Sequence, residues 1–513
     1  GVAWGSGSAG NDSLYGNASA NTLFGGSGAD LLDGGSGGDS LYGGSGNDTF
    51  TIDTGTDRAF GGDGSDTVRT TANATLGGGI ENLVLLGTAK FGIGDADANA
   101  ITGNNQANTL LGNSGNDTLN GGSGIDSLYG GSGNDLYLVD TATDRVTDVV
   151  NGGYDTVQAN LSFTLGAEIE ALILGGAAAI NGFGNNVANF IQGNGANNTL
   201  DGKVGADTLV GGSGNDVYYL DNLGDTVVET QGLDIVRAQV NGIGLFAGVE
   251  ALQLQAGVAW GSGSAGNDSL YGNAGVNTLF GGSGADLLDG SSGGDTLIGG
   301  SGDDTYVVDT ASDTIFDAGG LDTVRAAANT VLAAGLENLV LLGTAKVGQG
   351  NAAANLLTGN NQVNTLFGFS GADSLNGGSG IDTLVGGSGN DSYFVDTGTD
   401  RIIELGGGGL DTVHSVAGAY TMAAEVENLT MGGSALRAIG NGLDNTMTGT
   451  GGTNSLAGGS GNDWLIGGSG ADSLIGGFGN DTLAVDTATD KIFEVAGQGY
   501  DWALASASWH STR

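Results

Sequence analysis

The chain has 513 residues, of which 107 are glycine, and it contains neither proline nor cysteine. Its 57 acidic and 12 basic residues give a formal charge of −45, which makes a phosphate backbone or an anionic membrane surface a poor partner. Without cysteine there is no disulfide, thiolate metal site or cysteine nucleophile, and with 39% hydrophobic residues the chain is not a disordered acidic tail. The charge therefore calls for bound cations, and we expect no nucleic acid among the ligands.

The absence of proline favours an all-β fold in which nearly every backbone N–H donates to a neighbouring strand, because proline lacks that donor. No run of residues approaches the roughly 18 apolar positions of a membrane-spanning helix. We therefore expect no membrane span.

The sequence repeats itself on two scales. GVAWGSGSAGNDSLYGNA at residues 1–18 returns at 257–274, an offset of 256 residues. A shorter unit is marked by phrases such as NDTFTIDTGTD, which begin at steps of 87, 81, 88, 87 and 90 residues, at Asn47, Asn134, Asn215, Asp303, Asn390 and Asn480. The chain thus divides into six modules, which we place at 1–94, 95–183, 184–256, 257–349, 350–439 and 440–513, the last one truncated.

Within each module the sequence runs in rows of nine residues. In the first module GGSGADLLD, GGSGGDSLY and GGSGNDTFT place an aspartate at the sixth position of each row. IDTGTDRAF and GGDGSDTVR continue the same register at residues 52–69. The phrase that marks each module is therefore interpreted as another row whose glycines have been replaced.

The residue types predict the conformation of one row. Glycine at positions 1, 2 and 4 allows positive φ in a tight turn, and the next three residues form a short strand with position 8 facing inward. Two rows make a coil of about 18 residues, and coils stacked roughly 4.8 Å apart bring Asp12 near Asp30 and Asp30 near Asp48. Such carboxylates repel one another unless a cation neutralises them. Calcium, with six to eight oxygen ligands in flexible geometry, suits this arrangement better than magnesium.

Rows such as GGSGADLLD and GGSGNDWLI match GGxGxDxUx and so resemble the RTX (repeats-in-toxin, haemolysin-type) calcium-binding nonapeptide-repeat family. The resemblance implies a parallel β-roll or β-solenoid that holds calcium ions between successive turns, on the order of ten or more. It also implies export of an unfolded chain by a type I secretion system. The ligands that it implies are the position-six aspartates of the clear rows, Asp30, Asp39, Asp48, Asp117, Asp126, Asp135, Asp207, Asp216, Asp286, Asp295, Asp304, Asp373, Asp382, Asp391, Asp463, Asp472 and Asp481. Rows reached by continuing the register add the candidate ligands Asp12, Asp57, Asp66, Asp144, Asp225, Asp268, Asp313, Asp400 and Asp490.

Asparagine replaces aspartate at the start of most repeat blocks, at Asn21, Asn99, Asn108, Asn189, Asn198, Asn277, Asn355, Asn364, Asn445 and Asn454. Asparagine keeps a coordinating oxygen but loses the charge. We therefore predict weak or empty sites there, with ladders of side-chain amides in place of metal. In the third module Lys203 stands where the second glycine of a row belongs, and we expect that module to bind the least calcium.

The segments between the repeat blocks, such as residues 73–102, are rich in Leu, Val, Ile and Gly and have no sustained helical period. We interpret them as longer rungs of the same structure, which makes the whole chain one continuous solenoid. Small separate domains are the alternative.

The chain shows no arrangement of residues typical of an active site. GSGSAG at residues 5–10 matches GxGxxG and GGSGG at 34–38 matches GxSxG, but both lie in glycine repeats and lead into no helix. The histidines are His414 and His510, too far apart for an HExxH zinc motif, and His414 is interpreted as a strand residue equivalent to Arg69. We therefore expect no catalytic residue and no enzymatic activity.

Three functions remain, all with the chain secreted to the extracellular space or the cell surface. The first is structural: a calcium-rigidified rod that forms or supports a surface layer, a filament or an adhesin stalk, with possible self-association. The second is a calcium-binding secretion and folding tail of a larger enzyme or toxin. The third, ranked last, is a surface that binds sugar or ice. Aromatic residues at position 9, expected to face outward, either cover the sheet or contact another molecule: Tyr15, Phe24, Tyr42, Tyr129, Phe280 and Phe367.

Overall fold

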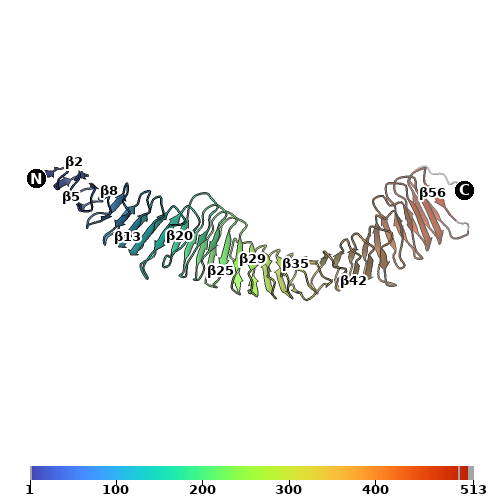
Figure 1. The fold of residues 1–513 in the computed structure, drawn as a ribbon. Coiled ribbons are helices and arrows are strands. Elements are labelled where there is room, and N and C mark those ends of the chain that lie inside the picture. Colours follow the sequence, from blue (N-terminus) through green and yellow to red (C-terminus); the bar gives the residue numbers. More distant parts are fainter. Residues whose placement is uncertain (1–2, 495–496, 507–513) are drawn as a thin grey trace. The chain divides into compact units, whose positions relative to one another are not determined.

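The structure is a computed structural model that describes residues 3–494 and 497–506, so that His510 lies outside the described residues. All regular elements in this part of the chain are β-strands, and none is a helix that could cross a membrane. The chain forms two compact units, Gly1–Gln253 and Leu254–Arg513. Figure 1 draws the strands of each unit as short arrows stacked side by side.

The first block of rows shows how the coils are built. Alternate strands belong to two different parallel sheets, so that each coil gives one strand to each sheet. One sheet contains β1 (Ala3–Ser6), β3 (Asn21–Ser27), β5 (Ser40–Ser45) and β7 (Arg58–Asp63). The other begins with β2 (Ser13–Tyr15), β4 (Leu31–Asp33), β6 (Thr49–Ile52) and β8 (Thr67–Thr70). This arrangement is an all-β parallel β-solenoid, as predicted.

The pairing register confirms the coil of 18 residues. Leu23 of β3 pairs with Leu41 of β5, and Leu32 of β4 pairs with Phe50 of β6. The phrase that marks the module also pairs as a row, because Ser40 lies opposite Arg58. Its glycines are lost, but its place in the solenoid is kept.

Side chains at position 8 fill the interior between the two sheets. Leu32, Leu41 and Phe50 are completely buried, whereas positions 7 and 9 are half-buried or exposed. The predicted outward direction of the position-9 aromatic residues is confirmed on β3, β5 and β7. There Phe24, Tyr42 and Phe60 stack with ring centroids 4.9 and 4.8 Å apart. The core is thus a column of one apolar side chain per row, and it has no depth beyond the coil.

The second unit opens with the same arrangement, 256 residues later. One sheet holds β30 (Trp260–Ser262), β32 (Thr278–Ser283), β34 (Thr296–Ser301) and β36 (Thr314–Phe316). The opposite sheet holds β31 (Ser269–Tyr271), β33 (Leu287–Asp289), β35 (Thr305–Val308) and β37 (Thr323–Ala326). Identical rows therefore fold in the same way in both units.

The segments between blocks are rungs of the solenoid, but they are not uniformly longer, so that part of our expectation was wrong. β10 (Asn82–Leu85) pairs with β8 and with β12 (Ala100–Thr102) in one sheet. Thr67 lies opposite Asn82, only 15 residues along the chain, because this rung contains no GGxG turn. The proposed module boundaries remain predictions.

Candidate metal sites

The turns of the GGxGxD rows assign different tasks to their three glycines. Gly44 and Gly46, at positions 2 and 4, have φ of 113° and 116°, a conformation that favours glycine. Gly43, at position 1, is not among the positive-φ residues, contrary to our expectation. A Cβ on Gly43 would instead lie less than 3.0 Å from Asp48 Oδ2 and from the Gly61 carbonyl oxygen. Position 1 therefore stays glycine to leave room for something held between oxygen atoms.

One oxygen of each position-six aspartate is used to join the coils. The Asp30 main-chain N–H donates to Asp48 Oδ1 at 2.8 Å, and the Asp12 N–H donates to Asp30 Oδ1 at 2.7 Å. The predicted proximity of these aspartates is therefore confirmed. Asp30 is 3% exposed and Asp48 1%, so each carboxylate is held in place and almost wholly removed from water.

The second oxygen of these buried aspartates has no hydrogen-bond donor among the described residues. Since buried polar atoms are nearly always satisfied, and buried charges are compensated, a repeated orphan oxygen indicates a missing ligand. Among the predicted ligands the orphan Oδ2 belongs to Asp30, Asp39, Asp48, Asp66, Asp117, Asp126, Asp135, Asp207, Asp216, Asp286, Asp295, Asp304, Asp373, Asp382, Asp391, Asp463, Asp472 and Asp481.

The space beside each orphan oxygen fits a calcium ion. A Cβ on Gly25 would lie less than 3.0 Å from Asp30 Oδ2 and from the Gly43 carbonyl oxygen, and Gly112 faces Asp117 Oδ2 and the Gly130 carbonyl in the same way. A carboxylate oxygen and a peptide carbonyl of the next coil thus converge on one point. These are the ligands that calcium prefers, at distances of about 2.3–2.6 Å.

Burial also changes the proton affinity of these carboxylates. Burial raises the pKa of Asp117 from 3.8 to about 7, and repulsion from Asp135 adds to it, although a hydrogen bond from the Asn99 N–H opposes the shift. The pKa of Asp463 is raised to about 7 for the same reasons, with Asp481 as the nearby charge. A carboxylate in such a place holds either a proton or a cation.

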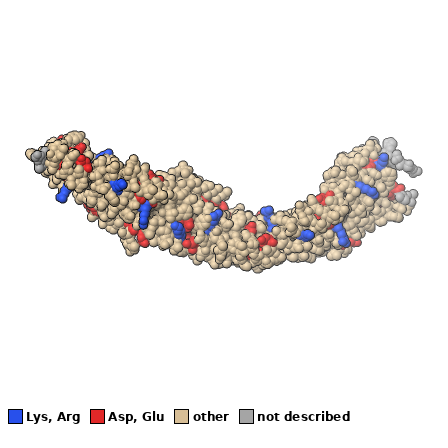
Figure 2. All heavy atoms as spheres, in the orientation of Figure 1, with Lys and Arg blue, Asp and Glu red and all other residues tan. Residues whose placement is uncertain are grey.

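Figure 2 shows where the negative charge lies. Most of the visible surface is uncharged, with acidic side chains appearing only in scattered groups. The position-six aspartates are buried instead inside the turns, in regular columns. The high formal charge is therefore concentrated at the candidate metal sites.

The aspartates that end the module-marking phrases differ from the other candidate ligands. Asp57 Oδ2 accepts from the main-chain N–H groups of Asp53 and Thr54, and Asp57 Oδ1 accepts from the Asp39 N–H and from Thr54 Oγ1. The same kind of hydrogen-bonded turn surrounds Asp144, Asp225, Asp313, Asp400 and Asp490. Although burial opposes the change, hydrogen bonds from Thr487 and Asp472 lower the pKa of Asp490. These turns are closed by their own donors.

Asp12 and Asp268, in the first rows of their blocks, are also partnered. Oδ2 accepts from the Ser8 N–H in the first case and from the Ser264 N–H in the second, both at 2.6 Å. These two carboxylates therefore have less need of a cation than Asp30 or Asp48.

The asparagine rows use a third kind of closure. Asn108 Oδ1 accepts from the Asn104 N–H at 2.8 Å, and Asn108 Nδ2 donates to the Ala89 carbonyl at 3.0 Å. Asn277 contacts Asn273 and Val258 in the same way. The predicted amide ladders are wrong, because the amide bonds to the main chain of the preceding coil and not to another amide. This N–H takes the place that a cation takes beside an aspartate, which agrees with weak or empty sites.

The structure also reveals buried carboxylates that the sequence reasoning missed. Asp155, Asp234, Asp322 and Asp411 each accept the N–H of the aspartate one coil earlier and carry an orphan Oδ2. Asp234 and Asp322 lie nine residues after Asp225 and Asp313, so continued counting would have found them. Asp155 and Asp411 follow their partners by 20 residues, and this insertion hid them.

Each aspartate column ends on a glutamate of the segment between blocks. The Asp66 N–H donates to Glu81 Oε2 at 2.7 Å, and the pattern returns at Glu170, Glu250, Glu337 and Glu427. The longer side chain spans the altered register at this rung. Lys203, in the third module, adopts φ of 59° in the turn, and its effect on calcium binding remains a prediction.

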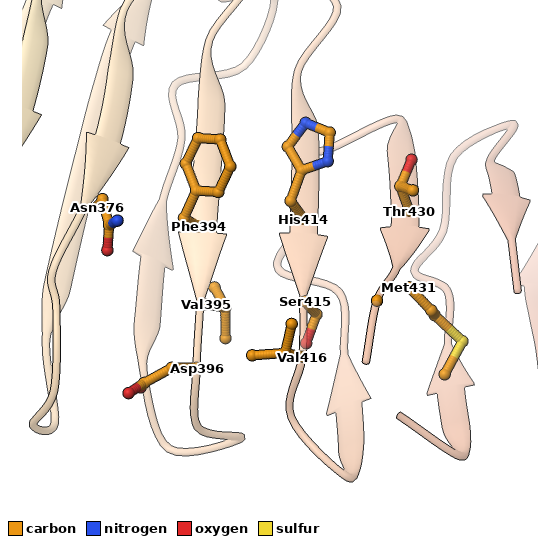
Figure 3. Close-up of a pocket in the computed structure, with 10 residues that line it drawn as sticks. Asn376, Phe394, Val395, Asp396, His414, Ser415, Val416, Thr430 and Met431 are labelled. Atoms are coloured by element: carbon orange, nitrogen blue, oxygen red, sulfur yellow. The ribbon is translucent and has the colours of Figure 1, made fainter. Parts of the chain in front are cut away.

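The second unit also has a shallow concavity around His414, shown in Figure 3. His414 lies on β47 (Thr412–Ser415) and stacks on Phe394 of β45 (Ser392–Val395), with ring centroids 5.0 Å apart. It occupies the same place in its strand as Arg69 in β8, as predicted. Met431 and Val416 line the rest of the concavity, which is therefore mainly a packing feature of the sheet surface.

A pair of substitutions tests the orphan oxygens. We expect Asp30→Ala with Asp48→Ala to open the first block locally while the block around Asp286 and Asp304 stays folded. Limited proteolysis in calcium, read by mass spectrometry, compares the two blocks within one chain. Equal protection of both blocks would contradict the role of these carboxylates. Asn at the same two positions keeps the Oδ1 acceptor and separates lost charge from lost hydrogen bonds.

Comparison with known proteins agrees with this geometry. A family model described as RTX calcium-binding nonapeptide repeat (4 copies) matches more than half of the chain, at residues 4–32, 24–58, 51–72, 93–128, 102–137, 111–144, 183–226, 262–297, 298–329, 349–384, 367–402 and 448–483. No curated protein matches the chain.

Proposed function

Because the chain belongs to the RTX calcium-binding nonapeptide repeat family, we propose that it is a secreted structural protein that calcium turns into a rigid rod. The family is a calcium-binding one and is typical of secreted proteins. The structural role is our proposal, and it rests on one observation: in each unit the described residues stack coil upon coil, with repeat blocks and connecting rungs alike paired into the sheets. Such a chain presents length and stiffness more than a cleft.

The proposed mechanism couples folding to calcium. Where calcium is scarce, as inside a cell, orphan carboxylates repel one another and the coils do not stack, so the chain stays extended and suited to type I secretion. Outside the cell, millimolar calcium binds the folded form and stabilises it. Folding then spreads from coil to coil, as in other proteins whose contacts are mainly between neighbours.

Two observations support a structural role over catalysis. His414 is packed against Phe394, and Ser415 beside it is buried. The exposed stack of Phe24, Tyr42 and Phe60 offers an apolar strip for contact with another molecule. We propose that the chain is not an enzyme and that it forms or supports a surface layer, a filament or an adhesin stalk.

Electron microscopy of the chain with excess calcium and with chelator tests this proposal. Filaments or sheets that appear only with calcium are the expected result for a self-assembling scaffold. Isolated rods in calcium would favour a stalk or a secretion tail of a larger enzyme or toxin. Assemblies that persist unchanged in chelator would contradict the calcium-dependent mechanism.

A further inference from the structure

The last turn of repeat blocks two to six contains an acidic residue that the nonapeptide pattern does not include. In the first block the row GGDGSDTVR follows β7 and contains a regular glycine turn. In the other blocks a less regular loop follows the corresponding strand, and an acidic residue replaces the glycine that aligns with Gly61. The acidic residues are Asp148, Glu229, Asp317, Glu404 and Glu494.

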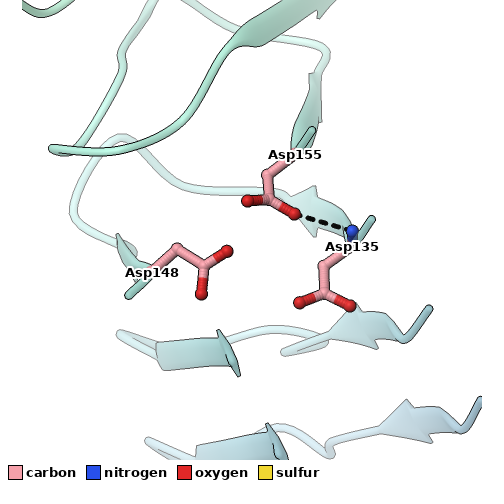
Figure 4. Close-up of side chains that lie close together, drawn as sticks. All are labelled: Asp135, Asp148 and Asp155. Atoms are coloured by element: carbon pink, nitrogen blue, oxygen red, sulfur yellow. Dashed lines mark hydrogen bonds between the residues drawn. The ribbon is translucent and has the colours of Figure 1, made fainter. Parts of the chain in front are cut away.

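Each of these acids joins two aspartates of the long column. In every group one ligand atom from each of three carboxylates lies within 4.8 Å of the others, in the groups Asp135–Asp148–Asp155, Asp216–Glu229–Asp234, Asp304–Asp317–Asp322, Asp391–Glu404–Asp411 and Asp481–Glu494–Asp501. Figure 4 shows the first group, with the carboxylates of Asp148 and Asp155 turned toward the space beside Asp135. Three carboxylates at this separation repel strongly unless a cation lies between them.

A tyrosine provides a second, independent sign of a ligand. In the fifth block the Tyr393 side chain is completely buried, yet its hydroxyl has no hydrogen-bond partner among the described residues. Asp391 Oδ2, Glu404 Oε1 and Asp411 Oδ2 are orphans as well. A Cβ on Gly386 would lie less than 3.0 Å from Tyr393 Oη, Asp391 Oδ2 and Glu404 Oε1, so these oxygens surround a single point.

The other tyrosines hold the third carboxylate in position. Tyr306 Oη donates to Asp317 Oδ1 at 2.7 Å, and Tyr218 Oη donates to Glu229 Oε2. Main-chain donors fix the acid further: Asp148 Oδ1 accepts from the N–H groups of Gly131 and Val149, both at 2.8 Å, while its Oδ2 remains free. The carboxylate is thus oriented by one oxygen and offers the other to the group.

The six blocks provide their own comparison. Blocks two to five have both the acid and the tyrosine, whereas the first block has Phe50 and Gly61 at these places. In the first block the Gly61 carbonyl oxygen faces the space beside Gly43. The acid therefore supplies an oxygen ligand where the irregular loop has lost the regular turn.

We propose that repeat blocks two to six each end in a separate three-carboxylate site for a calcium ion, distinct from the nonapeptide sites. Three negative charges and a preformed cage favour tighter binding than one carboxylate and carbonyls do. The site also ties a loop to the coil before it. In the second block this loop joins β17 (Arg145–Thr147) to β18 (Thr156–Ala159) and is held against β16 (Leu136–Val139). These sites fill first and fix the end of each block.

Equilibrium dialysis with radioactive calcium on the full chain tests this inference, which rests on the calcium binding proposed above. The five-fold variant D148N, E229Q, D317N, E404Q and E494Q is expected to lose five ions, all from the tightest class. A control variant carries the same change of charge at exposed aspartates, D53N, D140N, D309N, D396N and D486N, and is expected to keep these ions.

Each outcome decides between distinct failures. A five-fold variant that folds and binds as many tight ions as the unaltered chain would overturn the inference and leave the proposed function intact. An unaltered chain that binds no calcium would overturn both. If circular dichroism shows that the five-fold variant does not fold in calcium, E404Q alone decides, with the loss of one tight ion expected and no loss contradicting the inference.

Discussion

Transfer of the full chain from millimolar calcium into excess chelator at pH 8 is expected to abolish most of its β-sheet circular dichroism. The orphan carboxylates then face one another without a counter-charge, and each coil is joined to the next through such a pair. Each site filled at one hundred times its dissociation constant contributes about 2.7 kcal/mol. Several sites together therefore exceed the roughly 5–15 kcal/mol by which a typical domain is stable.

Returning calcium should restore the signal, whereas equal concentrations of magnesium should restore it only weakly, because magnesium requires a stricter octahedron and keeps its waters. A circular-dichroism spectrum that is unchanged in chelator would show that the apolar column alone holds the coils together. The asparagine rows provide an internal reference. Hydrogen exchange around Asn108 should be the slowest to increase, since its amide closes that turn without metal.

In the absence of calcium, acid is expected to stabilise the fold. Burial raises the pKa of Asp126 to about 6 and that of Asp117 to about 7, from 3.8. Burial, with repulsion from Asp411, raises the pKa of Glu404 to about 8. The folded chain thus binds more protons than the unfolded chain between about pH 4 and 8, so the free energy of unfolding falls as pH rises through this range. A chelated sample should be more folded at pH 5 than at pH 8.

Calcium should reverse this dependence, because the cation requires carboxylates without protons. Thermal unfolding followed by circular dichroism at pH 5, 6.5 and 8, with and without calcium, measures both trends. A chelated chain whose melting temperature rises from pH 5 to pH 8 would contradict the raised pKa values. The five-fold variant described above, which replaces Glu404 and its equivalents by amides, should show a weaker loss of stability with rising pH in chelator.

The fold could be predicted because its unit is short and its residue types are informative. Two rows of nine fix a coil of 18, and one apolar side chain per row fixes the interior, as the burial of Leu32 and Leu41 shows. Steric limits on glycine indicated the turns, but the reason for Gly43 could not be deduced from φ preferences. It depends on the oxygen atoms of a neighbouring coil, whose position only the structure provides.

The candidate ligands divided in a way that the sequence pattern could not reveal. Asp48 and Asp57 both occupy the sixth position of a row, yet one keeps an orphan oxygen and the other is enclosed by donors from Asp53 and Thr54. The difference lies in whether the loop folds back on its own carboxylate. Likewise Asp155 became part of the column only through an insertion of two residues, which a strict period of nine excludes.

The contacts that hold this molecule together lie between one coil and the next, and they recur at intervals of 18 residues. A chain pulled by its ends would therefore yield one coil at a time, and each freed coil would lengthen by about 60 Å at roughly 3.4 Å per residue. Coils joined through orphan carboxylates resist tension only while calcium is present, whereas coils joined through asparagine amides resist it in either case. Extension under load would then begin within the blocks and stop at the asparagine rungs, so the ion content of the surroundings would set how far the molecule stretches.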